Sequence, residues 1–244
     1  MTNKTLKNTT NHHSELPNTS FENIADKYAH AVDEKPIHAY YERPNLLSLL
    51  PEKISGLNIL DLGCGSGWYA EYLTQKGAKV WAIDASSTMV ELTKKRVPEA
   101  QVYQADLEEP LEILKNELFD LIIAPLVIHY IKDWHGLFTR LADKLKQKGH
   151  LIFSTHSPHT QYVGFNLKNY FEKTLITDYW ENVGEVKFYH HSLHELAEGL
   201  SQAGFVIEKM LEPMPLSEMK NADPKMYENV TTKPWFLFVR AMKK

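Results

Sequence analysis

Two hydrophobic periods alternate along the chain, and together they predict an α/β fold. Short, nearly continuous apolar runs are typical of strands in a buried parallel sheet, whereas apolar residues three and four positions apart indicate helices that cover it. Seven runs predict strands, at residues 57–61, 79–83, 102–106, 119–124, 151–155, 205–207 and 235–239. Helical patterns lie between them, after Gly67, from Ser86, over 134–145 and from Ser192.

The final connection predicts the direction of the last strand. It contains Pro213, Pro215 and Pro224 and shows no clear helical pattern. A parallel strand would need a crossover, which is usually a helix. We therefore expect the strand over 235–239 to run antiparallel in a sheet that is otherwise parallel.

The N-terminal region divides into a polar leader and two short helices. Residues 1–20 are rich in Asn, Thr and Lys and have almost nothing to bury, so they are expected to be disordered. Apolar residues at helical spacing from Phe21, and again from Tyr40 to Leu50, predict helices within 21–50 that cap one edge of the sheet. Residues 21–244 are expected to form a single domain.

A long aromatic insertion follows the fifth predicted strand. Residues 156–191 exceed the length of an ordinary connector, and 175–181 can pair with 185–190 as a hairpin across 182–184. In a parallel sheet this segment leaves the carboxyl edge, where ligands of such folds bind. We interpret it as a substrate lid, with a second small core or a homodimer surface as open alternatives.

Composition narrows the class of partner and the compartment. The chain has 244 residues, a formal net charge of −4 and one cysteine, Cys64. An acidic balance disfavours nucleic acid, and a lone cysteine that cannot form an internal disulfide suggests the reducing cytoplasm. No apolar run approaches the roughly 20 residues of a membrane span, so a membrane partner is not expected.

The candidate chemistry begins at the first predicted strand. It ends at Asp61, and Gly63, Gly65 and Gly67 follow at once. Glycines allow a ligand to lie against bare backbone at the positive end of the next helix. A fixed carboxylate at Asp61 repels a pyrophosphate but suits an ammonium group, and the third glycine comes one residue too early for the dinucleotide fingerprint. This pattern favours S-adenosylmethionine.

Four segments carry a family resemblance. The runs 59–67, 81–89, 104–107 and 119–125 resemble, in order and spacing, the motifs of class I S-adenosylmethionine-dependent methyltransferases. The similarity covers about residues 57–157 and is greatest to the small-molecule branch that includes ubiquinone and menaquinone biosynthesis enzymes. It implies a Rossmann-like, doubly wound, seven-stranded sheet with an antiparallel last strand.

The resemblance also implies a cofactor site. Asp84 lies 21 residues after Gly63, as expected of a carboxylate that accepts ribose hydroxyls, and losing it should weaken cofactor binding at least tenfold. Asp106 would accept the adenine amino hydrogen, and Met89 would touch the adenine face. Tyr41 resembles a residue of the helices that fold over the cofactor. The full set of cofactor-binding candidates is Tyr28, Arg43, Asp61, Gly63, Cys64, Gly65, Asp84, Ala85, Met89, Ala105, Asp106, Leu107 and Pro125.

Methyl transfer depends chiefly on positioning, so an obvious base is not required. Orientation supplies about 7 to 11 kcal/mol, against roughly 3 to 5 kcal/mol from a general base. If the acceptor is a hydroxyl, His129 and His156 are the candidate bases, because both follow strands whose carboxyl ends face the cofactor. His191 and His194 have metal-ligand spacing but no third partner, so no metal is expected.

The acceptor is expected to be a small, partly apolar molecule. Two other functions stay open at this point. One is a non-catalytic S-adenosylmethionine-binding regulator, and the other is a nicotinamide-dependent oxidoreductase. Amino-group methyltransferases of DNA carry a Pro-Pro-Tyr sequence where this chain has Pro125-Leu126-Val127, which disfavours a nucleic-acid acceptor.

Overall fold

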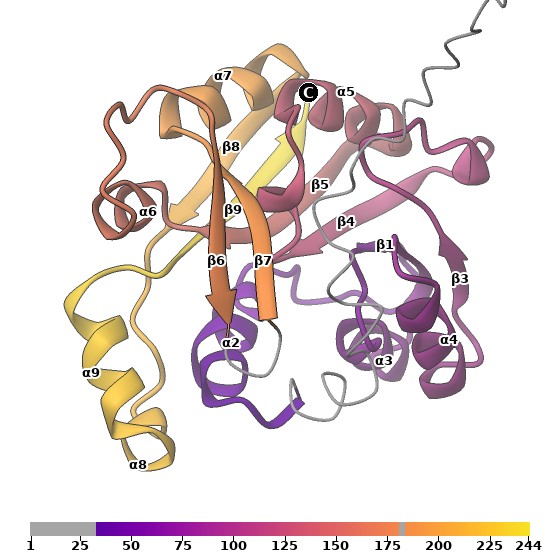
Figure 1. Ribbon diagram of the computed structural model, residues 1–244. Coiled ribbons are helices and arrows are strands. Elements are labelled where there is room, and N and C mark those ends of the chain that lie inside the picture. Colours follow the sequence, from indigo (N-terminus) through magenta and orange to yellow (C-terminus); the bar gives the residue numbers. More distant parts are fainter. Residues whose placement is uncertain (1–32, 181–183) are drawn as a thin grey trace, which may run out of the picture.

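The computed structural model describes residues 33–180 and 184–244. Seven strands form one sheet in the order β3-β2-β1-β4-β5-β9-β8 (Figure 1). They are β1 (Asn58–Leu62), β2 (Lys79–Asp84), β3 (Gln101–Gln104), β4 (Phe119–Pro125), β5 (Leu145–His156), β8 (Phe205–Leu211) and β9 (Phe236–Lys243). The predicted seven-stranded sheet is confirmed. The leader 1–20, Tyr28 and the helix predicted from Phe21 lie outside the described residues.

The strand directions also follow the prediction. Strands β1 to β5 pair in parallel with one another, whereas β9 runs antiparallel to both β5 and β8. The carboxyl ends of β1 to β5 therefore meet at one edge of the sheet, and the loops that leave this edge can converge on one ligand.

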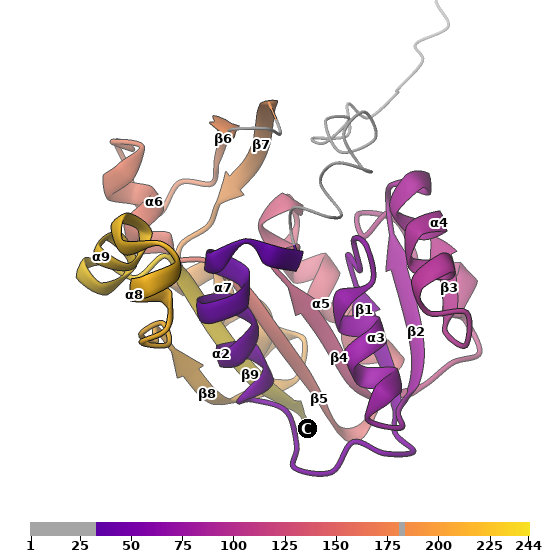
Figure 2. The ribbon, with the colours of Figure 1, turned by 90° about the horizontal axis from the view of Figure 1, so that it is seen from below.

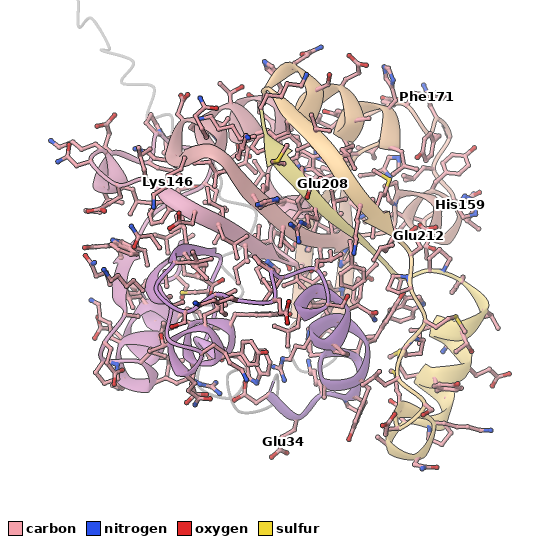
Figure 3. All side chains as sticks on the ribbon, turned by 180° about the vertical axis from the view of Figure 1, so that it is seen from behind. Glu34, Lys146, His159, Phe171, Glu208 and Glu212 are labelled. Atoms are coloured by element: carbon pink, nitrogen blue, oxygen red, sulfur yellow. The ribbon has the colours of Figure 1, made fainter. Side chains whose placement is uncertain are left out.

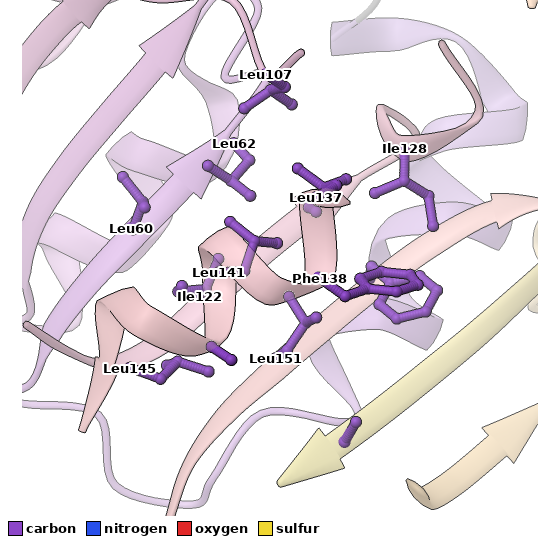
Figure 4. Packing of buried hydrophobic residues seen from close by; sticks show 14 of the residues in the cluster. Leu60, Leu62, Leu107, Ile122, Ile128, Leu137, Phe138, Leu141, Leu145 and Leu151 are labelled. Atoms are coloured by element: carbon purple, nitrogen blue, oxygen red, sulfur yellow. The ribbon is translucent and has the colours of Figure 1, made fainter. Parts of the chain in front are cut away.

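Helices cover both faces of the sheet. On one face, α5 (Trp134–Lys144) and α7 (Leu193–Gln202) share a buried cluster with Leu60, Leu62 and Ile122, as Figure 4 shows for α5. On the other face lie α2 (Arg43–Leu47), α3 (Trp68–Gln75) and α4 (Ser87–Arg96) (Figure 2). The five-residue π-helix η1 (His38–Glu42) leads into α2. α2 packs against β5 on this sheet face, and only its beginning reaches the carboxyl edge (Figure 2).

The prediction of no clear helix before the last strand is wrong. Two short helices fill this connection, α8 (Met219–Ala222) and α9 (Pro224–Thr232). The Asp223 side chain accepts a hydrogen bond from the Met226 amide at 2.9 Å and so caps α9, and Pro224 occupies the first helical position, where its missing N–H costs nothing. Pro224, one of the three prolines that argued against a helix, instead marks where α9 begins.

Several predicted strand limits also differ from the structure, and β8 and β9 extend to Leu211 and Lys243 rather than 207 and 239. β3 ends at Gln104 rather than 106, because Asp106 belongs to the turn that follows. β5 begins at Leu145 rather than 151, because Leu145 pairs with Phe119 across an irregularity in the ladder.

The insertion after β5 contains a helix and a hairpin. Its helix is α6 (Pro158–Gly164), and the strands β6 (Thr174–Trp180) and β7 (Gly184–His190) pair antiparallel, as predicted. Ile176, Val186 and Phe188 form a small core against Tyr130 of the 3₁₀ turn η3 (Ile128–Tyr130), which follows β4. The hairpin therefore stands over the carboxyl edge of the sheet (Figure 2).

No helix within 33–180 and 184–244 combines the length and apolar character needed to cross a bilayer.

Candidate functional site

The glycine turn between β1 and α3 forms the floor of the site. The amides of Gly63 and Cys64 donate to the Ile83 carbonyl at 2.8 and 3.0 Å, which fixes the turn to the end of β2. Gly63 and Gly65 have φ angles of +65° and +55°, in the left-handed region that favours glycine. A Cβ built on Gly65 would meet no described atom within 4 Å, so the space beside it can accept a ligand.

Asp61, at the end of β1, is a buried carboxylate without a hydrogen-bonding partner. Its exposed fraction is 1%, and neither oxygen has a partner among the described residues. Burial first, and the charge of Asp84 second, raise the pKa of Asp61 well above its usual value, although the nearby Ala70 amide acts in the opposite direction. Such a group needs a cation to remain ionised. The ammonium group of S-adenosylmethionine meets this need, so the residues fit the expected cofactor.

Asp84 holds the glycine turn to the second strand. One carboxylate oxygen accepts from the Gly65 amide at 2.9 Å, and the other accepts from the Ser86 amide at 2.9 Å. A carboxylate oxygen can accept more than one hydrogen bond, so these bonds are compatible with a further role of Asp84 in accepting ribose hydroxyls. The ribose role stays a prediction.

The Cys64 side chain is buried against α4. Its sulfur lies 3.6 Å from the hydroxyl of Thr93 on α4, and burial raises the pKa of the thiol well above its usual value. Only the backbone of Cys64 is therefore a cofactor contact candidate. Thr93 itself donates to the Gly65 carbonyl at 2.8 Å and supports the turn, a role that the helical pattern around it did not indicate.

Arg43 lies near the glycine turn but is already engaged. Its guanidinium lies over the Trp68 ring, 4.2 Å from the centroid, and donates to the Asp33 carbonyl at 2.7 Å. If Arg43 also paired with the cofactor carboxylate, that contact would be additional to these two. Tyr41 is fully buried and stacks on Phe236 with ring centroids 5.4 Å apart, so it packs in the core.

Glu42 is a buried acid that sequence reasoning missed. Its two oxygens accept from the Tyr69 hydroxyl at 2.8 Å and the Ser154 hydroxyl at 2.7 Å. Burial raises its pKa from 4.5 to about 7, against the opposing effect of these hydrogen bonds and of Arg43. The network joins the N-terminal segment, α3 and β5 across the carboxyl edge.

Replacing Glu42 by Gln should remove a pH dependence of stability. The folded protein retains the Glu42 proton up to about pH 7, whereas the unfolded chain releases it near 4.5. Stability therefore falls as the pH rises between these values and is then constant. At about 1.36 kcal/mol per pKa unit, the loss at pH 8 is roughly 3 kcal/mol.

Urea unfolding at pH 5 and pH 8 measures this effect. The exposed Glu34, which points away from the protein in Figure 3, provides the control Glu34→Gln, and that variant should behave as the wild type does. An equal change in stability between the two pH values in wild type and Glu42→Gln would contradict the assignment.

The adenine-side candidates lie in the loops that follow β2 and β3. The Ala105 amide donates to the Asp84 carbonyl at 3.0 Å, and the Ala85 carbonyl accepts from Gln104 at 2.9 Å, so the two loops are tied together. Asp106 accepts from the Glu108 amide at 2.9 Å and closes its own turn. Met89, in the first turn of α4, and Leu107 are both buried.

The acceptor-side candidates meet beyond β4 and β5. Pro125 ends β4, and the next residue, Leu126, has φ +48° and donates to the Ser154 hydroxyl at 3.0 Å. This sharp turn leads into η3, where the His129 ring stacks on His156 with centroids 4.0 Å apart. Phe188 of the hairpin packs edge-on to both rings.

The two stacked histidines differ in accessibility. His129 is 1% exposed, and neither nitrogen has a partner among the described residues. Burial, followed by His156 and His191, lowers the pKa of His129 well below its usual value. His156 is only partly buried, and burial lowers its pKa to about 4 against the opposing charge of Asp178. Both rings are therefore neutral at physiological pH, and each can accept a proton.

His191, the last residue of the insertion, has structural partners. His191 stacks on Trp134, with centroids 3.9 Å apart, and lies 3.0 Å from a carboxylate oxygen of Glu195. Within the described part of the chain, no group of three His, Cys, Asp or Glu side chains could hold a metal ion.

Comparisons with known proteins agree with this geometry. The family model described as methyltransferase domain matches residues 28–210. An uncharacterised protein of Haemophilus influenzae is 30% identical over 83% of this chain and 87% of its own length. A malonyl-acyl-carrier-protein O-methyltransferase of Priestia megaterium is 31% identical over 70% of this chain and 61% of its own.

The chain is also similar to a second named methyltransferase and to a solved structure. A ubiquinone biosynthesis O-methyltransferase of Bartonella quintana is 32% identical over 51% of this chain, and the match spans 49% of that enzyme. The structure of an S-adenosylmethionine-dependent methyltransferase from Mesorhizobium loti is 27% identical, with a TM-score of 0.71, over 85% of this chain and 100% of that one.

Proposed function

The chain belongs to the methyltransferase domain family, and we propose that it methylates a hydroxyl oxygen of a small, partly aromatic molecule, with His156 accepting the hydroxyl proton. S-adenosylmethionine-dependent methyl transfer to a small molecule is shown by the family, the relatives and the solved structure. The family and its relatives favour this activity over the oxidoreductase and regulator alternatives. Beyond this, we propose that the methylated atom is a hydroxyl oxygen, that the acceptor is partly aromatic and that the named residues have the stated roles.

One observation carries the proposal. The Nε2 atom of His156 has no hydrogen-bonding partner among the described residues, and it is accessible rather than fully buried. It lies at the carboxyl edge, under a hairpin whose inner residues include Phe188 and Trp180. A bare imidazole nitrogen among aromatic rings suits a phenolic hydroxyl. The O-methyltransferase names of two relatives add support.

The expected cofactor-binding roles follow from the site geometry. Asp61 would pair with the ammonium group, the bare backbone at Gly65 would lie along the nucleoside, and Asp84 would accept the ribose hydroxyls. S-adenosylmethionine supplies a methyl group on a positively charged sulfur. When bound, it would supply this methyl group to the acceptor oxygen and keep the electron pair of the broken sulfur–methyl bond, while Nε2 of His156 would accept the hydroxyl proton.

Replacing His156 by Ala should lower kcat for a phenolic acceptor by about 100-fold. General bases contribute about 10²- to 10⁴-fold, and a pKa of about 4 places His156 at the weak end of that range. The assay measures S-adenosylhomocysteine release with a panel of phenols, matched carboxylic acids and amines. The exposed His159, which projects from the surface in Figure 3, gives the control His159→Ala, whose kcat should match the wild type.

The panel also separates the proposal from its nearest competitor. A carboxylate acceptor is already deprotonated and needs no base. Turnover of carboxylic acids alone, with His156→Ala fully active, would overturn the proposal. S-adenosylhomocysteine binding by the variant should be unchanged, which excludes misfolding as the cause of a lost rate.

Location is inferred from composition, and assembly from residues exposed on the hairpin. We infer a cytoplasmic protein from its single cysteine, to be checked by cell fractionation, and a non-nucleic-acid acceptor from the net charge of −4.

The exposed Leu175 and Tyr179 on the hairpin keep a homodimer surface as a hypothesis. Sedimentation of the wild type and of a Tyr179→Lys variant would test it, because a monomeric wild type rejects the dimer.

A further inference from the structure

A chain of hydrogen bonds runs from His156 into the insertion. The His156 Nδ1 atom lies 3.4 Å from one end of the Gln161 side-chain amide, and the other end lies 3.2 Å from Nδ1 of His190. The Nε2 atom of His190 lies 2.9 Å from the Tyr170 carbonyl oxygen. Gln161 and His190 are 6% and 0% exposed, so solvent does not compete for these bonds.

The carbonyl fixes the proton positions at the far end of this chain. A carbonyl oxygen only accepts, so Nε2 of His190 must carry a hydrogen. Burial lowers the pKa of His190, so the ring is neutral at physiological pH and its Nδ1 is an acceptor. Gln161 must then turn its NH₂ group towards His190. The oxygen and nitrogen of an amide occupy equivalent positions, and the hydrogen-bond network decides between them.

The orientation of Gln161 then determines which nitrogen of His156 carries the hydrogen. With its NH₂ group on His190, Gln161 presents its oxygen to Nδ1 of His156, and that nitrogen must donate. The neutral His156 ring therefore carries its hydrogen on Nδ1 and leaves Nε2 bare. In the opposite tautomer, Nε2 would present a hydrogen to the acceptor hydroxyl and could not take its proton.

We propose that Gln161 and His190 are positioning residues that hold His156 in the tautomer with a bare Nε2 atom. The inference deepens the proposed function, because it matters for catalysis only if His156 is the base. The tautomer itself can be measured without any acceptor.

The first test is the tautomer of His156 in the full-length protein. Nitrogen-15-labelled histidine and a long-range proton–nitrogen spectrum at pH 7.5 report which ring nitrogen carries the hydrogen. His156 should show a protonated Nδ1 and a bare Nε2, and His190 should show the reverse. A hydrogen on Nε2 of His156 would overturn the inference whatever the enzyme methylates.

The second test is a pair of substitutions at Gln161. In Gln161→Leu the bond to Nδ1 is lost, so the spectrum should show the His156 hydrogen moving to Nε2, and kcat should fall about tenfold with KM little changed. In Gln161→Glu one carboxylate oxygen accepts from Nδ1 of His156, so the tautomer of His156 and most of kcat should return. The other oxygen faces Nδ1 of His190, which must take up a proton to donate to it. The exposed Gln202 supplies the control Gln202→Leu.

The pH profile gives a readout that a merely structural role would not move. His156 faces His129 from η3, Asp178 from β6 and Gln161 from α6. A carboxylate at position 161 adds a negative charge, so it should raise the pKa of His156. The rate of Gln161→Glu should then fall on the acid side at a pH where the wild type is unaffected. If Gln161→Leu and Gln161→Glu gave the same pH profile of the rate and the same histidine spectrum, the positioning role would be refuted.

The two proposals fail separately. A bare Nε2 in the wild-type spectrum, together with an active His156→Ala variant, supports the tautomer and rejects the base. A hydrogen on Nε2, together with an inactive His156→Ala variant, rejects the tautomer inference.

Discussion

Replacing Asp61 by Asn should weaken S-adenosylhomocysteine binding by about 30-fold to several thousand-fold. Removing one partner of a buried, hydrogen-bonded charge pair costs about 2 to 5 kcal/mol, and each 1.4 kcal/mol is a factor of ten. The product carries the same ammonium group as the methyl donor, so it probes the same contact. Titration calorimetry measures the dissociation constant directly.

The pH dependence of binding identifies the cause. Burial, and then Asp84, raise the pKa of Asp61 well above its usual value in the ligand-free protein, whereas pairing with ammonium requires the ionised form. Binding therefore releases a proton, and affinity rises with pH until Asp61 is ionised in the free protein. In Asp61→Asn this proton release should vanish. Calorimetry in two buffers with different heats of ionisation counts the protons.

The stability of the same variant provides an internal control. Because the folded pKa of Asp61 is raised, the folded state holds a proton that the unfolded chain releases, and the group lowers stability above its ordinary pKa. Asp61→Asn should thus melt at a higher temperature at pH 7.5 while binding more weakly. Weaker binding with a lower melting temperature would point to general damage instead.

Replacing Gly63 by Ala should destabilise the fold by about 2 to 5 kcal/mol. A Cβ at this position would lie 2.8 Å from Cβ of Val127 and closer still to its Cγ2, and φ is +65°. Overpacking costs about 1 to 3 kcal/mol, and a left-handed non-glycine residue about 1 to 2 kcal/mol more. The melting temperature should fall by roughly 4 to 20 °C, as measured by calorimetry.

Gly65 provides the matched comparison. Its φ of +55° imposes a similar backbone cost, but an added Cβ meets no described atom within 4 Å. Gly65→Ala should lose only about 1 to 2 kcal/mol of stability, yet it should bind S-adenosylhomocysteine poorly because the methyl group occupies ligand space. If Gly63→Ala and Gly65→Ala lost equal stability, the Val127 contact would not be the cause.

Features encoded by neighbouring residues were predictable from the sequence. The run ending at Asp61 and the glycines after it define a strand, a turn and a buried carboxylate within one short segment. The hairpin over β6 and β7 was likewise predictable, because its two strands are adjacent in the chain. The antiparallel β9 followed from the prolines, although these prolines also concealed α9.

Features that depend on distant partners were not predictable. Glu42 and Ser154 are 112 positions apart, and no local pattern pairs them. His129 and His156 could be assigned to one edge, because both follow parallel strands, but their stacking and the unpartnered nitrogens of His129 depend on how Phe188 closes over them. Thr93 looked like an ordinary helix residue, and only the folded turn reveals the carbonyl that it supports.

The position of β9 constrains the order in which the molecule can be completed during synthesis. Among the described strands, β8 forms ladder bonds with β9 alone, and β9 lies between β8 and β5. A nascent chain that has emerged only as far as Leu211 therefore exposes an open edge on β5 and an unmatched β8, both of which invite association with other chains. Until the segment Phe236–Lys243 is translated, such a chain would depend on the ribosome surface or on chaperones for protection.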